Sequence, residues 1–406
     1  MEGRILQALH LSCFTAASCL GAGLEATLKA LAANRSGLAR CAFETVALAT
    51  HVGEVAGVDD YRLPFDLADY DCRNNRLAVL TLEQDGFAET VRAAAQRYGA
   101  ARVGVFLGTS TAGILETEQA YRQLDEAGAF VAPPVYEGSH TPYALADVVA
   151  RHLGLSGPAF VVSTACSSGA KVFASAARLI GAGLIDAAVV GGVDSLCLTT
   201  LYGFNSLELV SPEPCRPYDS ERRGISIGEA AAFALLERPA GELPPDAVLL
   251  AGVGESSDAY HMSSPHPEGR GAEAAMRAAL VSAGLSPADV DYLNLHGTAT
   301  PSNDAAEGQA VMRLFGRDVP ASSTKGATGH TLGAAGALEV VIGALALKHG
   351  LIPGSPGSRA LDAALDLDYV FTPRAQALGV VMSNSFGFGG SNASVVLRRA
   401  DAKGHA

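Results

Sequence analysis

The sequence predicts an α/β protein, because buried-strand patterns alternate with helix patterns along most of the chain. Its 406 residues, 49% of them hydrophobic, suffice for two domain-sized units with substantial cores. Segments 163–192 and 322–350 share one order of features, in which hydroxyl residues and a tight turn precede a helix of small residues. This similarity suggests a duplicated unit, although helices rich in Ala and Gly match one another easily.

The first half of the chain, which we place at residues 1–245, carries four strand patterns and four helix patterns. The expected strands are residues 1–11, 102–107, 161–162 and 187–193. The expected helices are residues 24–33, 71–98, 143–153 and 170–179. Residues 238–246, RPAGELPPD, have the Pro and Gly content of a connection between two halves.

The second half, residues 246–406, repeats the alternation of strands and helices. We expect its strands at residues 248–253, 290–295, 319–323, 380–384 and 394–397. We expect its helices at residues 271–283 and 333–349. Such an alternation is typical of mostly buried sheets that are covered by helices.

The composition excludes some classes of function. The net charge of −13, from 29 basic and 42 acidic residues, argues against general binding to nucleic acid or to anionic membranes. No uninterrupted apolar run is long enough to span a bilayer, so we expect no membrane association. A local basic patch that binds an acidic partner remains compatible with this charge.

The seven cysteines form neither a disulfide framework nor a zinc pattern, because their number is odd and no C-x-x-C occurs. We therefore expect a reducing compartment and a cytoplasmic location. Residues 5–23 are apolar enough to suggest a secretory leader. Gln7 and His10 interrupt that run, and Arg4 is its only positive charge, so we favour a first strand and turn.

Cys166 lies in the stretch VVSTACSSGAK, residues 161–171, where a strand pattern leads through a turn into a helix pattern. A helix N-terminus carries partial positive charge, so it should lower the pKa of this thiol and favour the nucleophilic thiolate. A buried structural cysteine is the alternative, since buried free cysteines are common.

Two histidines follow later strand patterns. His296 begins HGTAT just after a predicted strand, and Asp304, a candidate supporting residue, follows close by. His330 ends the stretch KGATGH, whose Lys325 we expect to form a buried ion pair with Glu339. A lysine among glycines can indicate a phosphate loop, but the order G-x-x-x-x-G-K-[ST] is absent. A lone loop histidine is more often structural, so each signal alone is moderate.

The stretch NSFGFGGSN, residues 384–392, has a permissive backbone with two aromatic residues. It is either a tight structural loop or a mobile gate whose backbone N–H is available as an oxyanion donor.

Together these stretches resemble the elongating β-ketoacyl-acyl-carrier-protein synthases of the thiolase superfamily. The matching motifs are TACSSG, HGTAT, KGATGH-x-x-GAAG-x-x-E and NSFGFGGSN, with lesser matches at 191–194 and 216–229. They occur in the family's order and cover nearly the whole chain. The resemblance implies a duplicated thiolase-like fold with five α-β-α-β-α layers.

The resemblance also implies a reaction and its residues. Cys166 matches the acylated nucleophile, and His296 and His330 match two histidines that assist malonyl decarboxylation. Lys325 and Glu339 match a supporting pair. The implied reaction is a decarboxylative Claisen condensation with malonyl-acyl-carrier protein, in which imidazole N–H donors stabilise an enolate. A thiolase would need a second catalytic cysteine in the last loop, which this chain lacks.

Further residues are assigned by the same resemblance. Phe388 matches a gating aromatic whose backbone N–H joins that of Cys166 in an oxyanion hole. Thr298 and Thr300 match residues that contact phosphopantetheine, and Phe204 resembles an aromatic near the acyl pocket. Other candidates are Phe386 for substrate binding, and Arg73 and Arg76 for carrier docking. Ile225 and Glu208 depart from the family pattern, which leaves acyl specificity and docking open.

The resemblance implies no metal and no cofactor beyond the phosphopantetheine that the acyl carrier protein brings. It implies a homodimer, or a heterodimer with a chain-length subunit. Two alternatives stay open: a ketosynthase of a polyketide or aryl-polyene pathway, and a non-catalytic chain-length subunit. The latter is disfavoured because such subunits usually lose the nucleophile.

Overall fold

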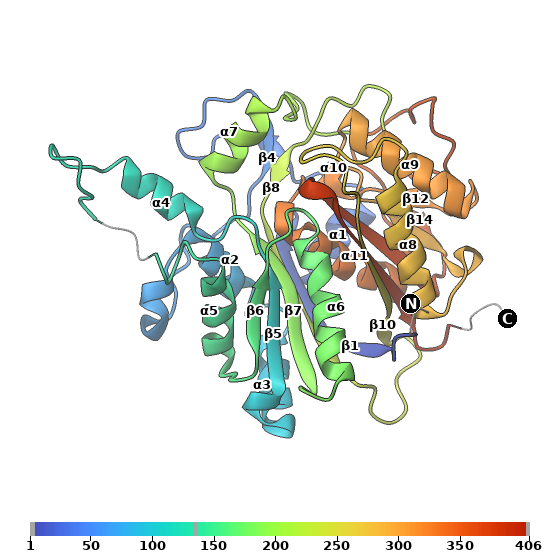
Figure 1. Ribbon diagram of the computed structural model, residues 1–406, viewed down its shortest axis with the longest axis horizontal. Coiled ribbons are helices and arrows are strands. Elements are labelled where there is room, and N and C mark those ends of the chain that lie inside the picture. Colours follow the sequence, from blue (N-terminus) through green and yellow to red (C-terminus); the bar gives the residue numbers. More distant parts are fainter. Residues whose placement is uncertain (1–4, 133–135, 403–406) are drawn as a thin grey trace.

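The computed structural model describes residues 5–132 and 136–402, and its centre is one mixed sheet of eleven strands (Figure 1). One end of the sheet is formed by β6 (Ala159–Val162), β5 (Val103–Gly108), β7 (Ala187–Asp194), β9 (Ala230–Glu237) and β1 (Leu9–Ser18), with β2 (Gly21–Ala22) beside β1. The other end continues with β10 (Val248–Ser257), β16 (Ser391–Arg399), β15 (Val380–Gly387), β11 (Tyr292–Asn294) and β12 (Ala321–Ser322).

The two ends of the sheet have the same topology. In the first half, β6, β5 and β7 are parallel, and β9 and β1 continue the sheet antiparallel. In the second half, β12, β11 and β15 are parallel, and β16 and β10 follow antiparallel. The chain visits the five strands in the same order in each half, so the structure confirms the duplicated unit. The halves join where β1 pairs with β10.

Helices divide the molecule into five layers, as expected. Helices α6 (Ser168–Gly181) and α11 (Ala335–His349) lie between the two half-sheets and share a core with both. Helices α2 (Arg73–Leu82), α3 (Phe87–Tyr98) and α5 (Tyr143–Leu153) cover the outer face of the first half. Helices α8 (Arg270–Ala283) and α9 (Pro301–Phe315) cover the second half (Figure 1).

Strand β9 shows why the layers form, since its side chains alternate between two cores. Phe233 and Leu235 face the outer core, whereas Ala232 and Ala234 face the middle layer. Small residues on the middle face let α6 and α11 approach the strands and each other. A Cβ atom added to Gly336 of α11 would lie 2.7 Å from the backbone nitrogen of Ala170 in α6. This close crossing brings the start of α6 beside the start of α11.

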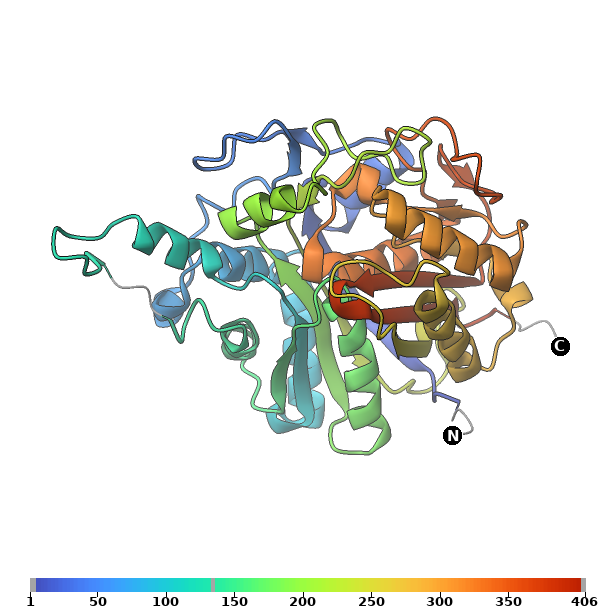
Figure 2. The ribbon, with the colours of Figure 1, turned by 45° about the horizontal axis from the view of Figure 1, so that its top comes forward.

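The remaining elements surround this core. The other helices are α1 (Leu24–Ala32), α4 (Ile114–Tyr121), α7 (Leu198–Ser206) and the short α10 (Lys325–Thr328). Strands β3 (Ala39–Arg40), β4 (His51–Gly53) and β8 (Ile227–Gly228) form a small sheet, and β13 (Leu351–Ile352) pairs with β14 (Arg374–Ala375). Helix α4 and the segment after it project away from the body in both ribbon views (Figures 1 and 2).

Two sequence predictions are corrected by the structure. The first strand begins at Leu9, whereas we expected residues 1–11, of which residues 1–4 lie outside the described part. The helix expected over 71–98 is two helices, α2 and α3, because Asp85 and Gly86 adopt left-handed conformations with φ of 56° and 69°.

Among the described residues, one helical segment, Leu332–His349, is long and apolar enough to cross a bilayer. Most of it, 89%, is buried inside the protein. Its position in the middle layer, with a half-sheet on either side, accounts for an apolar surface all round the helix.

Candidate active site

The structure places Cys166 in a sharp turn between β6 and α6. Ala165 has a left-handed backbone conformation with φ of 52°, which is unusual for a residue other than glycine. The hydroxyl of Ser168 holds this turn, because it accepts from the backbone N–H of Thr164 at 2.9 Å and donates to the Ala165 oxygen at 2.6 Å. The thiol is directed into a pocket, and Cys166 as a whole is only 5% exposed.

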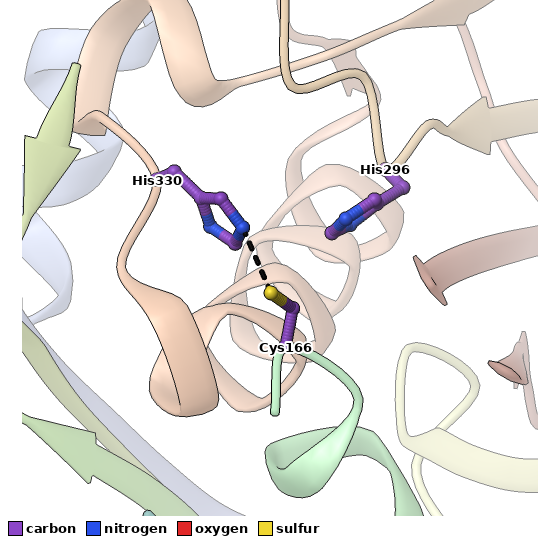
Figure 3. Close-up of side chains that lie close together, drawn as sticks. All are labelled: Cys166, His296 and His330. Carbon is purple, nitrogen blue, oxygen red and sulfur yellow. Dashed lines mark hydrogen bonds between the residues drawn. The ribbon is translucent and has the colours of Figure 1, made fainter. Parts of the chain in front are cut away.

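Two histidines from the second half lie beside this thiol (Figure 3). The Nε2 atom of His330, which follows α10, is 3.1 Å from the Sγ of Cys166. The ring of His296, which follows β11, lies edge to face with the ring of His330 at a centroid distance of 5.3 Å. The structure therefore brings together the three residues that the sequence singled out from three separate segments.

Hydrogen bonds behind the two rings fix which nitrogen carries the proton. The backbone N–H of Leu332 donates to Nδ1 of His330 at 3.3 Å, so the proton of the neutral ring is on Nε2. The ammonium nitrogen of Lys325 lies 3.4 Å from Nδ1 of His296, and an ammonium group can only donate. Both rings therefore present an Nε2–H to the space next to Cys166.

Both histidines are neutral at physiological pH. Burial, and next the positive charge of Lys325, lower the pKa of His296 and of His330 well below the usual value. Lys325 also donates to the backbone oxygen of His296 at 2.6 Å and forms an ion pair with Glu339. The expected Lys325–Glu339 pair is thus present, and it orders the segments that carry both rings.

The expectation of a lowered cysteine pKa is wrong for this state of the protein. Burial raises the pKa of the Cys166 thiol to about 11, although the charge of Lys325 and the backbone N–H of Phe388 lower it. The loss of hydration thus outweighs the donors around the sulfur. Cys166 is a thiol at neutral pH, and it needs to lose its proton during attack.

A buried carboxylate that sequence reasoning missed holds the His296 loop. Glu307 on α9 accepts from the backbone N–H of His296 and of Gly297, each at 2.8 Å, and from the Asn384 side chain at 3.2 Å. Its signal in the sequence is one acidic residue on an otherwise ordinary helix, which does not distinguish it from a surface residue.

The expected supporting residue Asp304 also holds backbone in place. Its carboxylate accepts from the backbone N–H of Tyr218 at 2.8 Å and of Ala299 at 3.2 Å. Asp194, to which we assigned no role, links the two halves. It accepts from Ser110 of the first half at 2.7 Å and from the backbone N–H of Gly333, near the start of α11, at 2.5 Å.

The pocket around Cys166 is narrow, with about 50 Å³ of free volume, and both apolar and polar residues line it. The apolar lining residues include Phe204, Leu209 and Ile225, and the polar lining residues include serine, threonine and asparagine residues. Thr298 and Thr300 are among the polar lining residues, with their hydroxyls 2.9 Å apart. Of the remaining candidates, Phe386 packs on His296 and Phe388 packs on Phe204, with ring centroids 5.9 and 5.5 Å apart.

The loop that carries Phe388 is attached to a neighbouring loop. The backbone N–H of Gly389 donates to the Met262 oxygen at 2.7 Å, and the side chain of Asn392 donates to Asp258 at 2.8 Å. A Cβ atom on Gly387 would lie 2.9 Å from the backbone oxygen of Thr164 and 3.2 Å from the backbone nitrogen of Cys166, so a side chain here would displace the turn that carries Cys166. The backbone N–H groups of Phe388 and Cys166 both lie close enough to the sulfur to lower the pKa of the Cys166 thiol, although burial outweighs them.

The Cys-His-His set has the ligand types of a zinc site, and its ligand atoms lie within 4.8 Å of one another. A metal would need a bare Nε2 on each ring, whereas both rings present Nε2–H. The nearby Lys325 ammonium would also repel a cation. The arrangement therefore suits a developing oxyanion better than a metal ion.

The structure contradicts the expectation that Arg73 is available for docking. Arg73 is 2% exposed, and its guanidinium group binds the carboxylates of Glu229, Asp59 and Glu54. Arg76 is partly exposed but is paired with Asp71 at 2.6 Å. The acidic neighbours explain the error, because all but Asp71 are remote from the arginines in sequence.

Comparisons with known proteins agree with this geometry. The family models described as "Beta-ketoacyl synthase, N-terminal domain" and "Beta-ketoacyl synthase, C-terminal domain" match residues 76–240 and 247–358. Nodulation protein E of Rhizobium meliloti (strain 1021) is 38% identical over 309 residues, which cover 74% of this chain and 76% of that protein. The 3-oxoacyl-(acyl-carrier-protein) synthase 2 of Vibrio cholerae serotype O1 is 32% identical over 410 residues, with 94% and 96% covered.

Among solved structures, one chain of the complex of the ketosynthase ApeO with its chain length factor ApeC, from Xenorhabdus doucetiae, is similar to this chain. It superposes with a TM-score of 0.88 at 39% identity and covers 97% of this chain and 98% of the matched chain. A β-ketoacyl synthase from Burkholderia phymatum STM815 has a TM-score of 0.84 at 29% identity, with 98% and 100% covered.

Proposed function

The chain belongs to the β-ketoacyl synthase family, and from this premise we propose how its residues carry out the condensation. It is an acyltransferase of the 3-oxoacyl-acyl-carrier-protein synthase type with a thiolase-like fold. The observation that supports the assignment of residues most directly is the pair of Nε2–H donors beside the Cys166 thiol.

The first step is acyl transfer to Cys166. The sulfur attacks the carbonyl carbon of an acyl thioester, a new C–S bond forms, and the bond to the carrier's thiol breaks. The thiol proton of Cys166 passes to the departing sulfur, which fits a nucleophile whose raised pKa keeps it protonated beforehand. The backbone N–H groups of Cys166 and Phe388 donate to the carbonyl oxygen while it carries negative charge.

The second step is decarboxylation of malonyl-carrier protein. The bond to the carboxylate breaks, CO₂ leaves, and the electron pair moves to the thioester oxygen as an enolate. The Nε2–H groups of His296 and His330 donate to that oxygen. The enolate carbon then attacks the acyl group on Cys166 and gives a 3-oxoacyl-carrier protein. The Cys166 sulfur leaves as a thiolate and takes up one proton from solvent, which restores the thiol.

In this proposal the phosphopantetheine arm of the carrier contacts polar residues that line the pocket. Thr298 and Thr300 are among them and can donate to or accept from the arm's amides. Phe204 and Ile225 are apolar lining residues, which we assign to the acyl chain. The reaction needs no further cofactor in this proposal, because the two substrates themselves bring the thioesters and the carboxylate that react.

We propose that the protein is a dimer. Strand β6 forms one edge of the central sheet, and its apolar residues are only half-buried, so a second chain can pair with it. The partner is either a second copy or a chain-length subunit, as in the complex of ApeO with ApeC. Light scattering of the purified chain, alone and after co-expression with such a subunit, distinguishes the two. We also propose that the chain divides into two halves after residue 245 and that the protein is located in the cytoplasm.

Similarity to 3-oxoacyl-(acyl-carrier-protein) synthase 2 favours fatty-acid elongation as the pathway in which this chain acts. A specialised polyketide or aryl-polyene ketosynthase is the second candidate, favoured by the 39% identity over nearly the whole chain to a chain of the complex of ApeO with ApeC. The intact Cys166 speaks against a non-catalytic subunit. The test is mass spectrometry of the chain after incubation with acyl- and malonyl-carrier proteins. An acyl group on Cys166 and a 3-oxoacyl product support the proposal, whereas product formation by Cys166→Ala would contradict it.

A further inference from the structure

Two thiols that the proposed chemistry does not use lie against the short helix α10, which carries Lys325. The Sγ of Cys215 is 3.2 Å from the backbone oxygen of Lys325. The Sγ of Cys19 is 3.6 Å from the backbone oxygen of Ala327 and 3.5 Å from that of Thr328. In each contact the thiol is the donor, because a carbonyl oxygen can only accept.

These contacts satisfy carbonyl groups at the end of a helix. The last four carbonyls of a helix lack partners within it, and α10 has only four residues. The C-cap N–H of Gly329 also donates to the Lys325 oxygen, at 2.8 Å, so the Cys215 thiol is a second donor there. The Ser36 hydroxyl donates to the Gly326 oxygen at 2.8 Å, and the Gly37 N–H donates to the Ala327 oxygen at 2.9 Å. Besides the Gly329 N–H, four donors therefore hold the carbonyl end of α10: the thiols of Cys19 and Cys215, the Ser36 hydroxyl and the Gly37 N–H. They come from three separate segments of the chain.

Both thiols are permanent donors at neutral pH. Burial raises the pKa of Cys19 to about 12 and that of Cys215 to about 11, so neither loses its proton. Space around Cys19 is closed as well: a Cβ atom on Gly37 or Gly53 would lie 2.6 or 2.9 Å from its sulfur. The Cys19 thiol fills the gap between these glycines and α10.

We propose that Cys19 and Cys215 are positioning residues for the condensation, because their thiols fix α10 and thereby the histidines that flank it. From α10, the Lys325 ammonium reaches His296, and the chain continues directly to His330, whose ring faces Cys166. Decarboxylation depends on the placement of both rings, whereas acyl transfer depends on the Cys166 turn. This inference rests on the proposed function.

The test compares Cys215→Ala and Cys19→Ala with the corresponding serine variants. We expect CO₂ release from malonyl-carrier protein to fall about fivefold in each alanine variant, the effect of one hydrogen bond of about 1 kcal/mol. Acylation of Cys166, measured by mass, stays near the wild-type rate. Serine keeps a donor at the same position, so Cys215→Ser and Cys19→Ser restore most of the CO₂ release.

Cys72→Ala is the matched control. Cys72 is fully buried and caps α2 by accepting from the Asn75 N–H at 3.4 Å, and among the described residues its thiol forms no hydrogen bond with α10. Its loss should lower stability and leave the ratio of CO₂ release to acylation unchanged. The inference is overturned if the alanine variants at Cys19 and Cys215 keep the wild-type ratio of CO₂ release to acylation, or if the serine variants fail to restore it. Either result leaves the proposed function intact. A wild-type chain without CO₂ release overturns the proposed function and, with it, this inference.

Discussion

The ammonium nitrogen of Lys325 donates to the backbone oxygen of His296 at 2.6 Å and lies 3.4 Å from Nδ1 of the same residue. One cation thus fixes both the position of this histidine and the nitrogen on which its proton resides. The ring becomes a donor of Nε2–H toward the pocket, and it remains neutral because burial and the nearby positive charge lower its pKa.

Replacement of Lys325 by Met should therefore change the affinity of the site for metals as well as the rate. Without the ammonium group, His296 can carry its proton on Nδ1 and expose a bare Nε2 beside the Cys166 sulfur. We expect CO₂ release to fall and Zn²⁺ binding to tighten, as measured by calorimetry. The double variant Lys325→Met/Cys166→Ala should lose the gained affinity. Equal Zn²⁺ affinity in wild type and Lys325→Met would contradict the proposed control of the proton position.

Replacement of either histidine should slow malonyl decarboxylation much more than acylation of Cys166. His296→Ala and His330→Ala each remove one enolate donor, so malonyl decarboxylation should fall on the order of 10²–10³-fold. Acylation of Cys166 should persist, because its oxyanion donors are backbone N–H groups. The fold loss of decarboxylation in the double variant should be smaller than the product of the two single fold losses, since the effects of groups that act as a unit are not additive. Abolished acylation with intact CO₂ release would reverse the roles.

Glu339 should give CO₂ release a pH dependence near neutrality. Burial raises the pKa of Glu339 to about 7, although the charge of Lys325 lowers it. Above pH 7 the carboxylate balances the buried ammonium, and below pH 7 protonation removes that counter-charge and loosens the pair. CO₂ release should therefore fall as the pH drops from 8 to 6. Glu339→Gln should lack this transition, and a transition that survives the change would assign it to another group.

The reactivity of Cys166 should rise steeply with pH. Because burial raises its pKa to about 11, the thiolate fraction should grow about tenfold per pH unit between pH 7 and 10. Alkylation by iodoacetamide, followed by peptide mass spectrometry, measures this slope. Free cysteine serves as the reference and levels off above its own pKa. A plateau for Cys166 near pH 8 would show that the thiolate is more stable than the surroundings of the sulfur suggest.

Arg73 should contribute to stability, because it is a buried cation bound to three carboxylates. Arg73→Met leaves the buried Glu229 without its cationic partner, so the free energy of unfolding should fall by about 3–5 kcal/mol. Urea unfolding measures this loss. Arg76→Met, which breaks a partly exposed pair, should lower stability much less, and any increase in the KM for carrier protein should appear in that variant.

Much of the fold was predictable because the strands and helices carry clear patterns. Helix α5 has the predicted bounds, and β10, α8 and α11 begin within two residues of the predicted positions. Strand β9 was missed, since its sequence AAAFALLE has alanines in place of β-branched residues. Ala230, Ala232 and Ala234 are explained by the helices of the middle layer, against which they pack, and that packing is tertiary information.

The site was predictable in its residue types and not in its electrostatics. Cys166, His296 and His330 could be found because each follows a strand within a distinctive motif. The raised pKa of Cys166 could not, because it depends on how completely segments distant in sequence exclude water. Glu307 was missed for a related reason: its partners are backbone N–H groups, which no side-chain pattern reveals.

The position of β1 in the sheet has a consequence for synthesis of the protein. His10 pairs with Glu237 on one side and Leu249 on the other, so apart from the two-residue β2 the first strand has no neighbouring strand until more than half the chain has been made. At 5–20 residues per second, β1 waits roughly 10–45 s on the ribosome before β9 can emerge and pair with it. An apolar strand with unpaired edges is prone to aggregate during that interval. Recombinant yield should therefore improve at lower expression rates or with a chaperone that binds nascent apolar segments.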